Sequence, residues 1–91
     1  MTPAQIALAR HALGLPNSDN RSYRNRFCAG KGHSDHPKWN ALVSAGLATV
    51  TRHAGGLGGQ DTFRLTLAGA KAALAKGESL CPEDFPEVQH G

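Results

Sequence analysis

The sequence predicts a small α+β domain with three to four helices and a two-stranded β-hairpin. Three observations lead to this fold class. Apolar residues recur with helical spacing over 2–13 and 37–47, residues 48–53 and 62–65 alternate as strands do, and the glycine-rich stretch 54–61 separates the two strands. A chain of 91 residues fits one domain, for which we expect residues 1–77, followed by an acidic extended tail over 78–91.

The first helix has clear start and stop signals. Thr2 and Gln5 are three residues apart and predict a capping box, and Pro3 fits the first helical position. Gly14 predicts a left-handed end, and Pro16 prevents continuation. The predicted apolar stripe comprises Ile6, Ala9 and Leu13, widened by Leu8 and Ala12.

The polar segment that follows allows two interpretations. Ser18 or Asp19 could cap a short helix to about Phe27, in which Tyr23 and Phe27 share one face. An irregular loop is the alternative. Residues 28–36, with Gly30 and Gly32, are expected to form a connector.

The central helix and the hairpin carry the predicted core. Ser34 or Asp35 can cap a helix whose first turn holds Pro37, and Gly46 followed by Leu47 predicts a Schellman ending. Trp39 on this helix and Phe63 on the second strand are the expected core anchors. The inward side of the helix comprises Trp39, Leu42 and Val43, and that of the second strand comprises Phe63 and Leu65.

The C-terminal part predicts one more helix and then a tail. Thr66 is the expected cap of a helix that reaches Leu74 and is ended by Gly77. Leu80 and Phe85 are expected to pin the tail to the body, with disorder beyond Phe85.

The distribution of charge predicts an anionic partner. Residues 1–64 hold eight Lys/Arg and three Asp/Glu, whereas residues 65–91 hold two and four. A basic body attracts polyanions through electrostatic steering and counterion release. We expect one positive face, with Asn40 able to reach a base edge. The candidate nucleic-acid or partner-binding residues are Arg21, Tyr23, Arg24, Arg26, Lys31, Lys38, Asn40, Arg52, His53 and Arg64.

Other chemistry is weakly indicated. Cys28, His33 and His36, with Cys81 as a fourth ligand, are the residue types that bind zinc, but their spacing matches no common finger. We therefore interpret them as a buried thiol and two surface histidines, and predict no metal and no cofactor. A Cys–His pair without an oxyanion hole predicts no enzyme. The glycine-rich stretch lacks the Lys-Ser/Thr of a phosphate loop.

The sequence also bears on location. It lacks an apolar run of about 18 residues and a signal peptide, so we expect a cytoplasmic protein with reduced cysteines and no membrane partner.

Two resemblances carry functional expectations. The stretch Trp39–Leu74 resembles MarR-like winged helix-turn-helix regulators in Leu42-Val-Ser-Ala-Gly-Leu47, in the hairpin over 49–64 and in Leu65-Thr-Leu-Ala-Gly69. It implies a winged-helix-like domain that binds double-stranded DNA, with a homodimer as one form in which the domain could bind. The central helix would lie in the major groove, and the hairpin would form the wing.

The chain also resembles small uncharacterised proteins of phages and prophages. The matching residues are Ala12-Leu-Gly-Leu-Pro-Asn17, Arg21-Ser-Tyr-Arg-Asn-Arg-Phe27, Gly32-His33, Trp39 and Pro82-Glu-Asp-Phe85. This resemblance implies a regulator in a bacterial host cell, or an anti-CRISPR-like inhibitor that binds a host protein complex. For the inhibitor, Tyr23, Phe27 and Leu57 are the candidate anchors.

Overall fold

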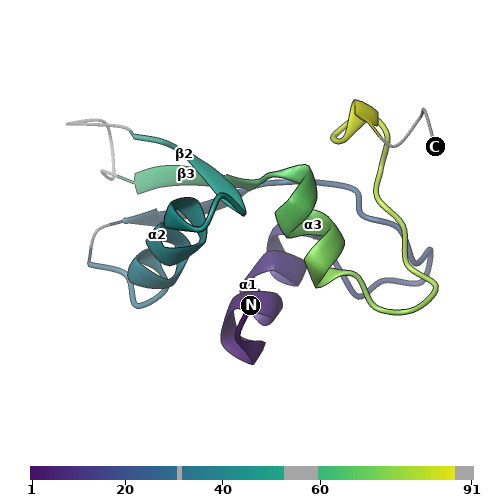
Figure 1. Cartoon of the computed structure of the whole chain (residues 1–91), viewed down its shortest axis with the longest axis horizontal. Coiled ribbons are helices and arrows are strands. Elements are labelled where there is room, and N and C mark those ends of the chain that lie inside the picture. Colours follow the sequence, from purple (N-terminus) through teal and green to yellow (C-terminus); the bar gives the residue numbers. More distant parts are fainter. Residues whose placement is uncertain (31, 53–59, 88–91) are drawn as a thin grey trace.

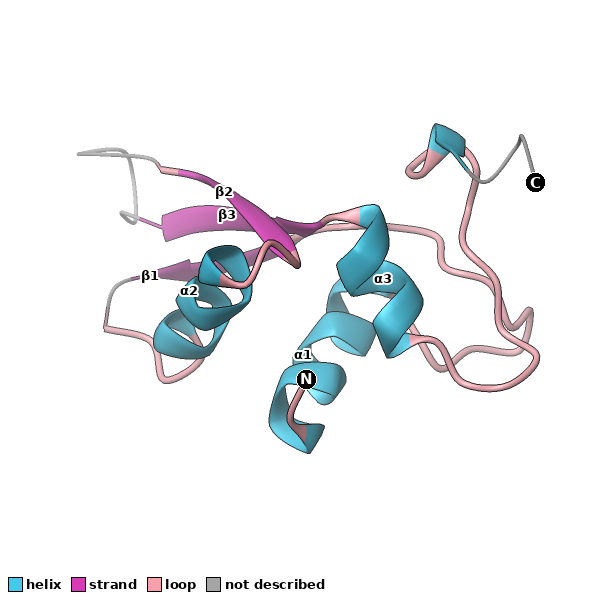
Figure 2. Ribbon diagram, viewed as in Figure 1, coloured by secondary structure: helices cyan, strands magenta, loops and turns pink. Residues whose placement is uncertain are grey.

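The chain folds as a small α+β domain. The computed structural model describes residues 1–30, 32–52 and 60–87. In that part of the chain the elements are α1 (Pro3–Leu13), β1 (Phe27–Gly30), α2 (His36–Ser44), β2 (Ala48–Thr51), β3 (Gln60–Leu65) and α3 (Leu67–Ala73). The strands form an antiparallel sheet of order β1-β3-β2 (Figures 1 and 2). The predicted class is confirmed, but the two-stranded sheet is wrong because β1 adds a third strand.

β1 forms where the sequence predicted a connector. Phe27 pairs with Phe63, and the ladder runs on to the pair Gly30 and Gln60. Beyond it, the Asn25 side chain donates to the Leu65 carbonyl (3.0 Å) and accepts from the Leu65 N–H (2.9 Å). An amide side chain thus extends the sheet where backbone pairing stops, which a local sequence pattern does not reveal.

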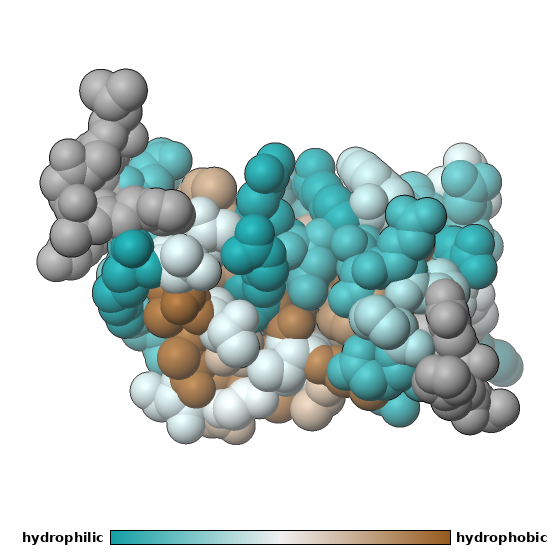
Figure 3. All heavy atoms as spheres, turned by 90° about the horizontal axis from the view of Figure 1, so that it is seen from above, coloured by the Kyte–Doolittle hydropathy of each residue, from teal (hydrophilic) through white to brown (hydrophobic). Residues whose placement is uncertain are grey.

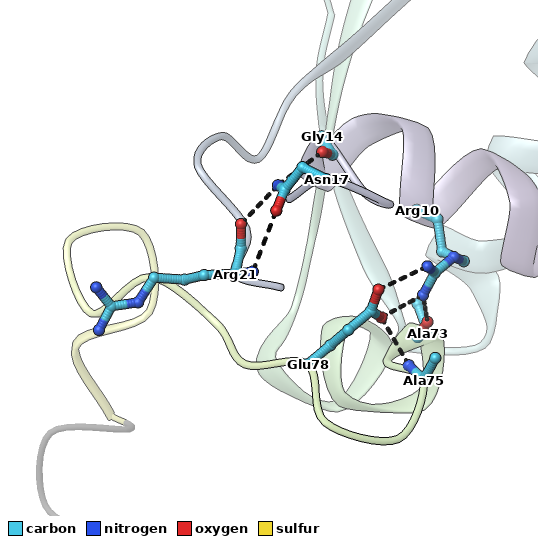
Figure 4. A network of polar contacts seen from close by, with 7 residues as sticks. All are labelled: Arg10, Gly14, Asn17, Arg21, Ala73, Ala75 and Glu78. Atoms are coloured by element: carbon cyan, nitrogen blue, oxygen red, sulfur yellow. Dashed lines mark hydrogen bonds and ion pairs between the residues drawn. The ribbon is translucent and has the colours of Figure 1, made fainter. Parts of the chain in front are cut away.

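The segment before β1 is the irregular loop, and the alternative of a short helix is wrong. Asn17 organises the turn (Figure 4): its Nδ2 donates to the carbonyls of Gly14 (3.0 Å) and Arg21 (2.8 Å). Its Oδ1 accepts from the Asp19 N–H at 3.1 Å. The Asn side chain therefore replaces the backbone bonds that a helix would have supplied.

Most helix ends follow the sequence signals. The Thr2–Gln5 capping box is present, and Gly14 has φ 81°. At the end of α2 the Leu47 N–H reaches the Leu42 carbonyl (2.9 Å) while Gly46 has φ 76°, which confirms the Schellman ending. Asp35 stands at the N-cap of α2, but its side chain makes no capping hydrogen bond.

The end of α3 differs from the prediction. Thr66 caps the helix as expected, yet α3 ends at Ala73 rather than at Gly77. Arg10 Nη1 donates to the Ala73 carbonyl (3.0 Å), and Glu78 Oε1 accepts the Ala75 N–H (2.8 Å). These two side chains take up backbone groups at the helix end, so the helix needs no further turn.

The core lies between the helices and one face of the sheet. Trp39 and Phe63 are fully buried and stack with ring centroids 5.4 Å apart at 24°, which confirms both anchors. Leu80 and Phe85 are also buried, so the tail is pinned as expected. The disorder expected beyond Phe85 falls mainly on residues 88–91, outside the described residues.

Contacts between residues far apart in sequence hold the tail. Ser79 exchanges backbone hydrogen bonds with the 20–22 segment, donating to Asn20 (2.9 Å) and accepting from Ser22 (3.0 Å). The Arg10 guanidinium holds the Glu78 carboxylate with two hydrogen bonds (Figure 4), one of them Nη2 to Oε2 at 2.8 Å. α1 is therefore tied to the tail by a bidentate ion pair.

This ion pair predicts a pH dependence of stability. The hydrogen bond from Arg10, then that from Ala75 N–H and the Arg10 charge, lower the pKa of Glu78 from 4.5 to about 2. A depressed folded-state pKa stabilises the fold above pH 4.5, and this contribution is lost as the pH falls toward 2. We expect the melting temperature to fall over this window, and Glu78→Gln to remove part of the fall.

The control for this pH dependence is Glu83→Gln, at an exposed tail carboxylate. It should keep the wild-type pH profile in calorimetry. A Glu78→Gln profile parallel to that of the wild type would contradict the role of the ion pair.

Candidate nucleic-acid interface

One face of the sheet carries polar side chains and is exposed. Strand alternation buries Ala29, Phe63 and Leu65 against the helices and turns their neighbours outward. Cys28 Sγ and Thr62 Oγ1 lie 3.8 Å apart on the outward side. We call this side the open face; it comprises Cys28, Thr49, Thr51, Thr62 and Arg64, of which Thr62 alone is half-buried.

Two arginines meet at one end of the open face. The β1–β3 ladder ends at the pair Phe27 and Phe63, and the Asn25 side chain bonds to Leu65 just beyond it. Arg26 directly precedes Phe27 and Arg64 directly follows Phe63, so both arginines stand at this end of the sheet, where Arg64 also pairs with Thr49 on β2. Both arginines are exposed, and neither side chain has a hydrogen-bond or ion-pair partner among the described residues. Like charges on facing strands destabilise a sheet, so this arginine pair is suited to an anion.

The other face of the sheet holds a connected set of polar contacts. Asp61 Oδ2 lies 2.9 Å from His36 Nε2 and 2.8 Å from Arg52 Nη1. Asn40 links His36 to Arg52: its Nδ2 lies 3.2 Å from His36 Nδ1, and its Oδ1 lies 3.3 Å from Arg52 Nη2. We call these four residues the polar ring. It ties α2 to β3 and to the chain just after β2.

The polar ring defines the state of the histidine. Arg52 can only donate, so Asn40 turns its oxygen to Arg52 and its NH₂ to His36. His36 Nδ1 then accepts from Asn40 and Nε2–H donates to Asp61, a hydrogen-bond assignment that follows from the neighbours of the imidazole. Asp61 and His36 are 3% and 6% exposed. The ring is thus a clamp around a buried carboxylate and a buried imidazole, with Arg52 exposed at its edge, and it occupies the Asn40 amide that was expected to read a base.

The remaining basic candidates are dispersed. Arg24 donates to the His11 carbonyl from Nε (3.2 Å) and Nη2 (2.7 Å), at the end of α1. Lys38 Nζ lies 3.7 Å from Asp35 Oδ1. Arg21 is exposed on the 14–26 loop. Lys31 and His53 lie outside the described residues.

The expected single positive face is wrong. Arg64 pairs with Thr49, and Arg52 bonds to Asp61. Asp61 and Arg64 are three positions apart on β3, so they project to opposite faces. Arg52 therefore belongs to the polar ring on one side of the sheet, and Arg64 belongs to the open face on the other side.

The candidate metal ligands occupy separate surroundings. Cys28 is on the open face, His36 is in the polar ring, His33 is exposed beside Asp35, and Cys81 is on the tail. Among the described residues no group of three or more His, Cys, Asp or Glu is placed to hold a metal ion. The interpretation as a buried thiol and two surface histidines is wrong for Cys28, which is exposed, and for His36, which is buried.

Asp61 is the important residue that sequence reasoning missed. It was placed in the glycine-rich loop, whereas it lies on β3 in phase with Phe63 and Leu65. Extending the strand alternation backwards by one step would have placed this carboxylate inside.

Comparisons with protein-family models, with curated proteins and with solved structures find no match to this chain. Its function is therefore argued from the geometry alone. Within the described residues, no helix has the length and apolarity that crossing a bilayer requires.

Proposed function

We propose that this chain is a winged-helix-like DNA-binding module that holds the phosphate backbone through the arginine pair. The observation that carries the proposal is the presence of two exposed arginines at one end of the sheet: Arg64 on the open face and Arg26 directly before β1, next to the pair Phe27 and Phe63. Arginine binds phosphate in a bidentate manner, and threonine hydroxyls such as that of Thr49 are common phosphate donors. The winged-helix likeness rests on α2 followed directly by the β2–β3 hairpin (Figure 1).

Contacts to phosphate are favoured over readout of bases. The outward side chains of α2 include Pro37, Ala41 and Ser44, together with one cation, Lys38, which is beside Asp35. Asn40 is held in the polar ring. A helix with this surface offers few groups for base edges, so binding with little sequence preference is the expected mode. The face of the molecule shown in Figure 3 is mainly hydrophilic, and the apolar residues on it form small groups.

A protein-binding inhibitor is the second candidate, and one observation favours it. Tyr23 is 63% exposed, and exposed aromatic side chains are frequent interface anchors. Of the other expected anchors, Phe27 is half-buried against Trp39 with ring centroids 5.4 Å apart, and Leu57 lies outside the described residues. Capture of a host protein that is lost with Tyr23→Ala would favour this candidate.

The proposal predicts a change in salt dependence. Arg26→Ala or Arg64→Ala should weaken binding to every duplex and reduce the slope of log K against log salt by about one, because one phosphate contact is lost. Fluorescence anisotropy with a random-sequence duplex at several salt concentrations measures both quantities.

The matched control is Lys76→Ala, an exposed cation in the turn after α3 and distant in sequence from the open face. It should leave the slope close to that of the wild type. Equal slopes for all four proteins would remove the arginine pair from the interface, and absence of duplex binding at low salt would reject the proposed function.

A further inference from the structure

Tyr23 is an exposed aromatic residue on a firmly held backbone. Its N–H donates to the Leu13 carbonyl at 3.1 Å. The preceding Ser22 is 1% exposed, donates its N–H to Ser79 (3.0 Å) and accepts the Cys81 N–H on Oγ (2.9 Å). The loop thus presents this ring from a fixed base, although the ring itself is 63% exposed.

Gly14 supports one face of the ring. A Cβ at Gly14 would lie 2.2 Å from Tyr23 Cε1 and 2.6 and 2.7 Å from the two carbons bonded to Cε1. The distances to these two neighbouring carbons are nearly equal and only slightly longer than the distance to Cε1. This pattern places the Cβ above the face of the ring, since a Cβ beyond the ring edge would be much farther from both neighbouring carbons. Gly14 also has φ 81°, so glycine is required there for its conformation and for its lack of a side chain.

The surroundings of the ring are cationic. The Arg24 guanidinium carbon lies over the ring, 5.3 Å from its centroid, and the Nε and Nη2 atoms of this group donate to the His11 carbonyl. Arg21 is two residues before the tyrosine and is exposed. The segment 14–30 contains three arginines and one acidic residue, Asp19. An aromatic plane with one supported face and adjacent cations combines the two features of sites for single-stranded nucleic acid.

We infer that Tyr23 is a stacking platform for an unpaired nucleobase, with the adjacent phosphates bound by Arg21 and by the outer edge of the Arg24 guanidinium. The inference deepens the proposed function, on which it rests, by giving the protein a preference for nucleic acid with a single-stranded segment. The fixed orientation of the ring lowers the entropy that stacking costs. Base stacking is sequence-tolerant because every base has a π-face, which agrees with a surface that offers few groups for base edges.

The test compares single-stranded and duplex probes by fluorescence anisotropy. Tyr23→Ala should weaken binding of a labelled oligothymidylate by roughly 5- to 100-fold, the range that loss of one stacked base gives. Binding to a blunt duplex should change less than about twofold, because paired bases cannot reach the ring. Tyr23→Phe keeps the aromatic plane and should retain wild-type affinity for both probes.

A second probe separates stacking from charge. This probe is an oligonucleotide of the same length in which every thymine is replaced by an abasic site, so that it keeps every phosphate but has no base to stack. Wild-type protein should bind it about as weakly as Tyr23→Ala binds the normal strand, and Tyr23→Ala should not discriminate between the two strands. Melting temperatures of both variants close to that of the wild type would show that the fold is intact.

The failure of this inference is distinguishable from the failure of the proposed function. Equal affinity of wild type and Tyr23→Ala for oligothymidylate overturns the platform, even if the duplex is bound, and leaves the exposed ring to a protein partner. Absence of duplex binding by the wild type and by every variant, together with oligothymidylate binding that depends on Tyr23, overturns the proposed function and supports the platform.

Discussion

Replacing Gly69 by alanine is expected to lower the free energy of unfolding by about 3 kcal/mol, the upper range for overpacking. Gly69 is buried in the first turn of α3, where a Cβ would lie 2.0 Å from the Leu47 carbonyl oxygen and 2.9 Å from its carbon. That oxygen also accepts the Thr66 N–H at 3.1 Å. Any backbone shift that relieves this clash therefore also disturbs the hydrogen bond between Thr66 and Leu47, which fixes the start of α3.

Helix propensity alone predicts the opposite sign for this substitution. Alanine is preferred to glycine in a helix by about 1 kcal/mol, so a stabilised variant would show that Leu47 and α3 are not in close contact. The control is Gly32→Ala, because a Cβ at Gly32 meets no atom within 4 Å. Urea unfolding of the two variants should give a large loss for Gly69→Ala and little change for Gly32→Ala.

Asp61→Ala is expected to cost about 2–4 kcal/mol, the range for leaving buried hydrogen-bonding groups and a charge without a partner. The substitution removes the acceptor of His36 Nε2–H and of Arg52 Nη1. His36 is 6% exposed and cannot turn to water. The loss therefore includes the desolvation of the imidazole as well as the broken contacts.

The matched comparison is Arg52→Ala. Its side chain is 51% exposed, so its ion pair is screened, and truncation should cost about 1 kcal/mol or less. Asp61 keeps His36 as a partner in this variant. Chemical denaturation of both variants and of the double variant yields the coupling energy between the two residues. Equal losses for the two single variants would contradict a buried carboxylate as the centre of the polar ring.

Local signals predicted the parts of the fold that local physics decides. Thr2 with Gln5, Gly46 with Leu47, and Thr66 each satisfy groups within a few residues, and all three are present. β1 could not be predicted in this way, because a strand of four residues depends on β3, whose paired residues are 30 to 36 positions away. The end of α3 was missed for a related reason, since Arg10 on α1 takes its last carbonyl.

The candidate site shows the same division. Arg26 and Arg64 are far apart in the sequence, and only the pairing of β1 with β3 brings them to the same end of the sheet. Asn40 and Arg52 looked like surface donors on their own elements, yet each is used by the polar ring. The support of Tyr23 by Gly14 follows from a loop that folds back onto α1. The residue types in the sequence indicated which side chains could bind a partner. Contacts between residues far apart in the sequence decide on which surface each of these side chains lies.

The attachment of the tail to α1 has a consequence for synthesis of the protein. Leu80 and Phe85 complete the core, and Glu78 supplies the partner of Arg10, which is 68 positions earlier. A nascent chain cannot make these contacts until residue 85 has left the ribosomal exit tunnel, so the final packing follows translation of nearly all of the described chain. Premature termination before that point would leave α1 and α3 with exposed apolar surface, a feature that cellular proteases recognise in unfolded chains.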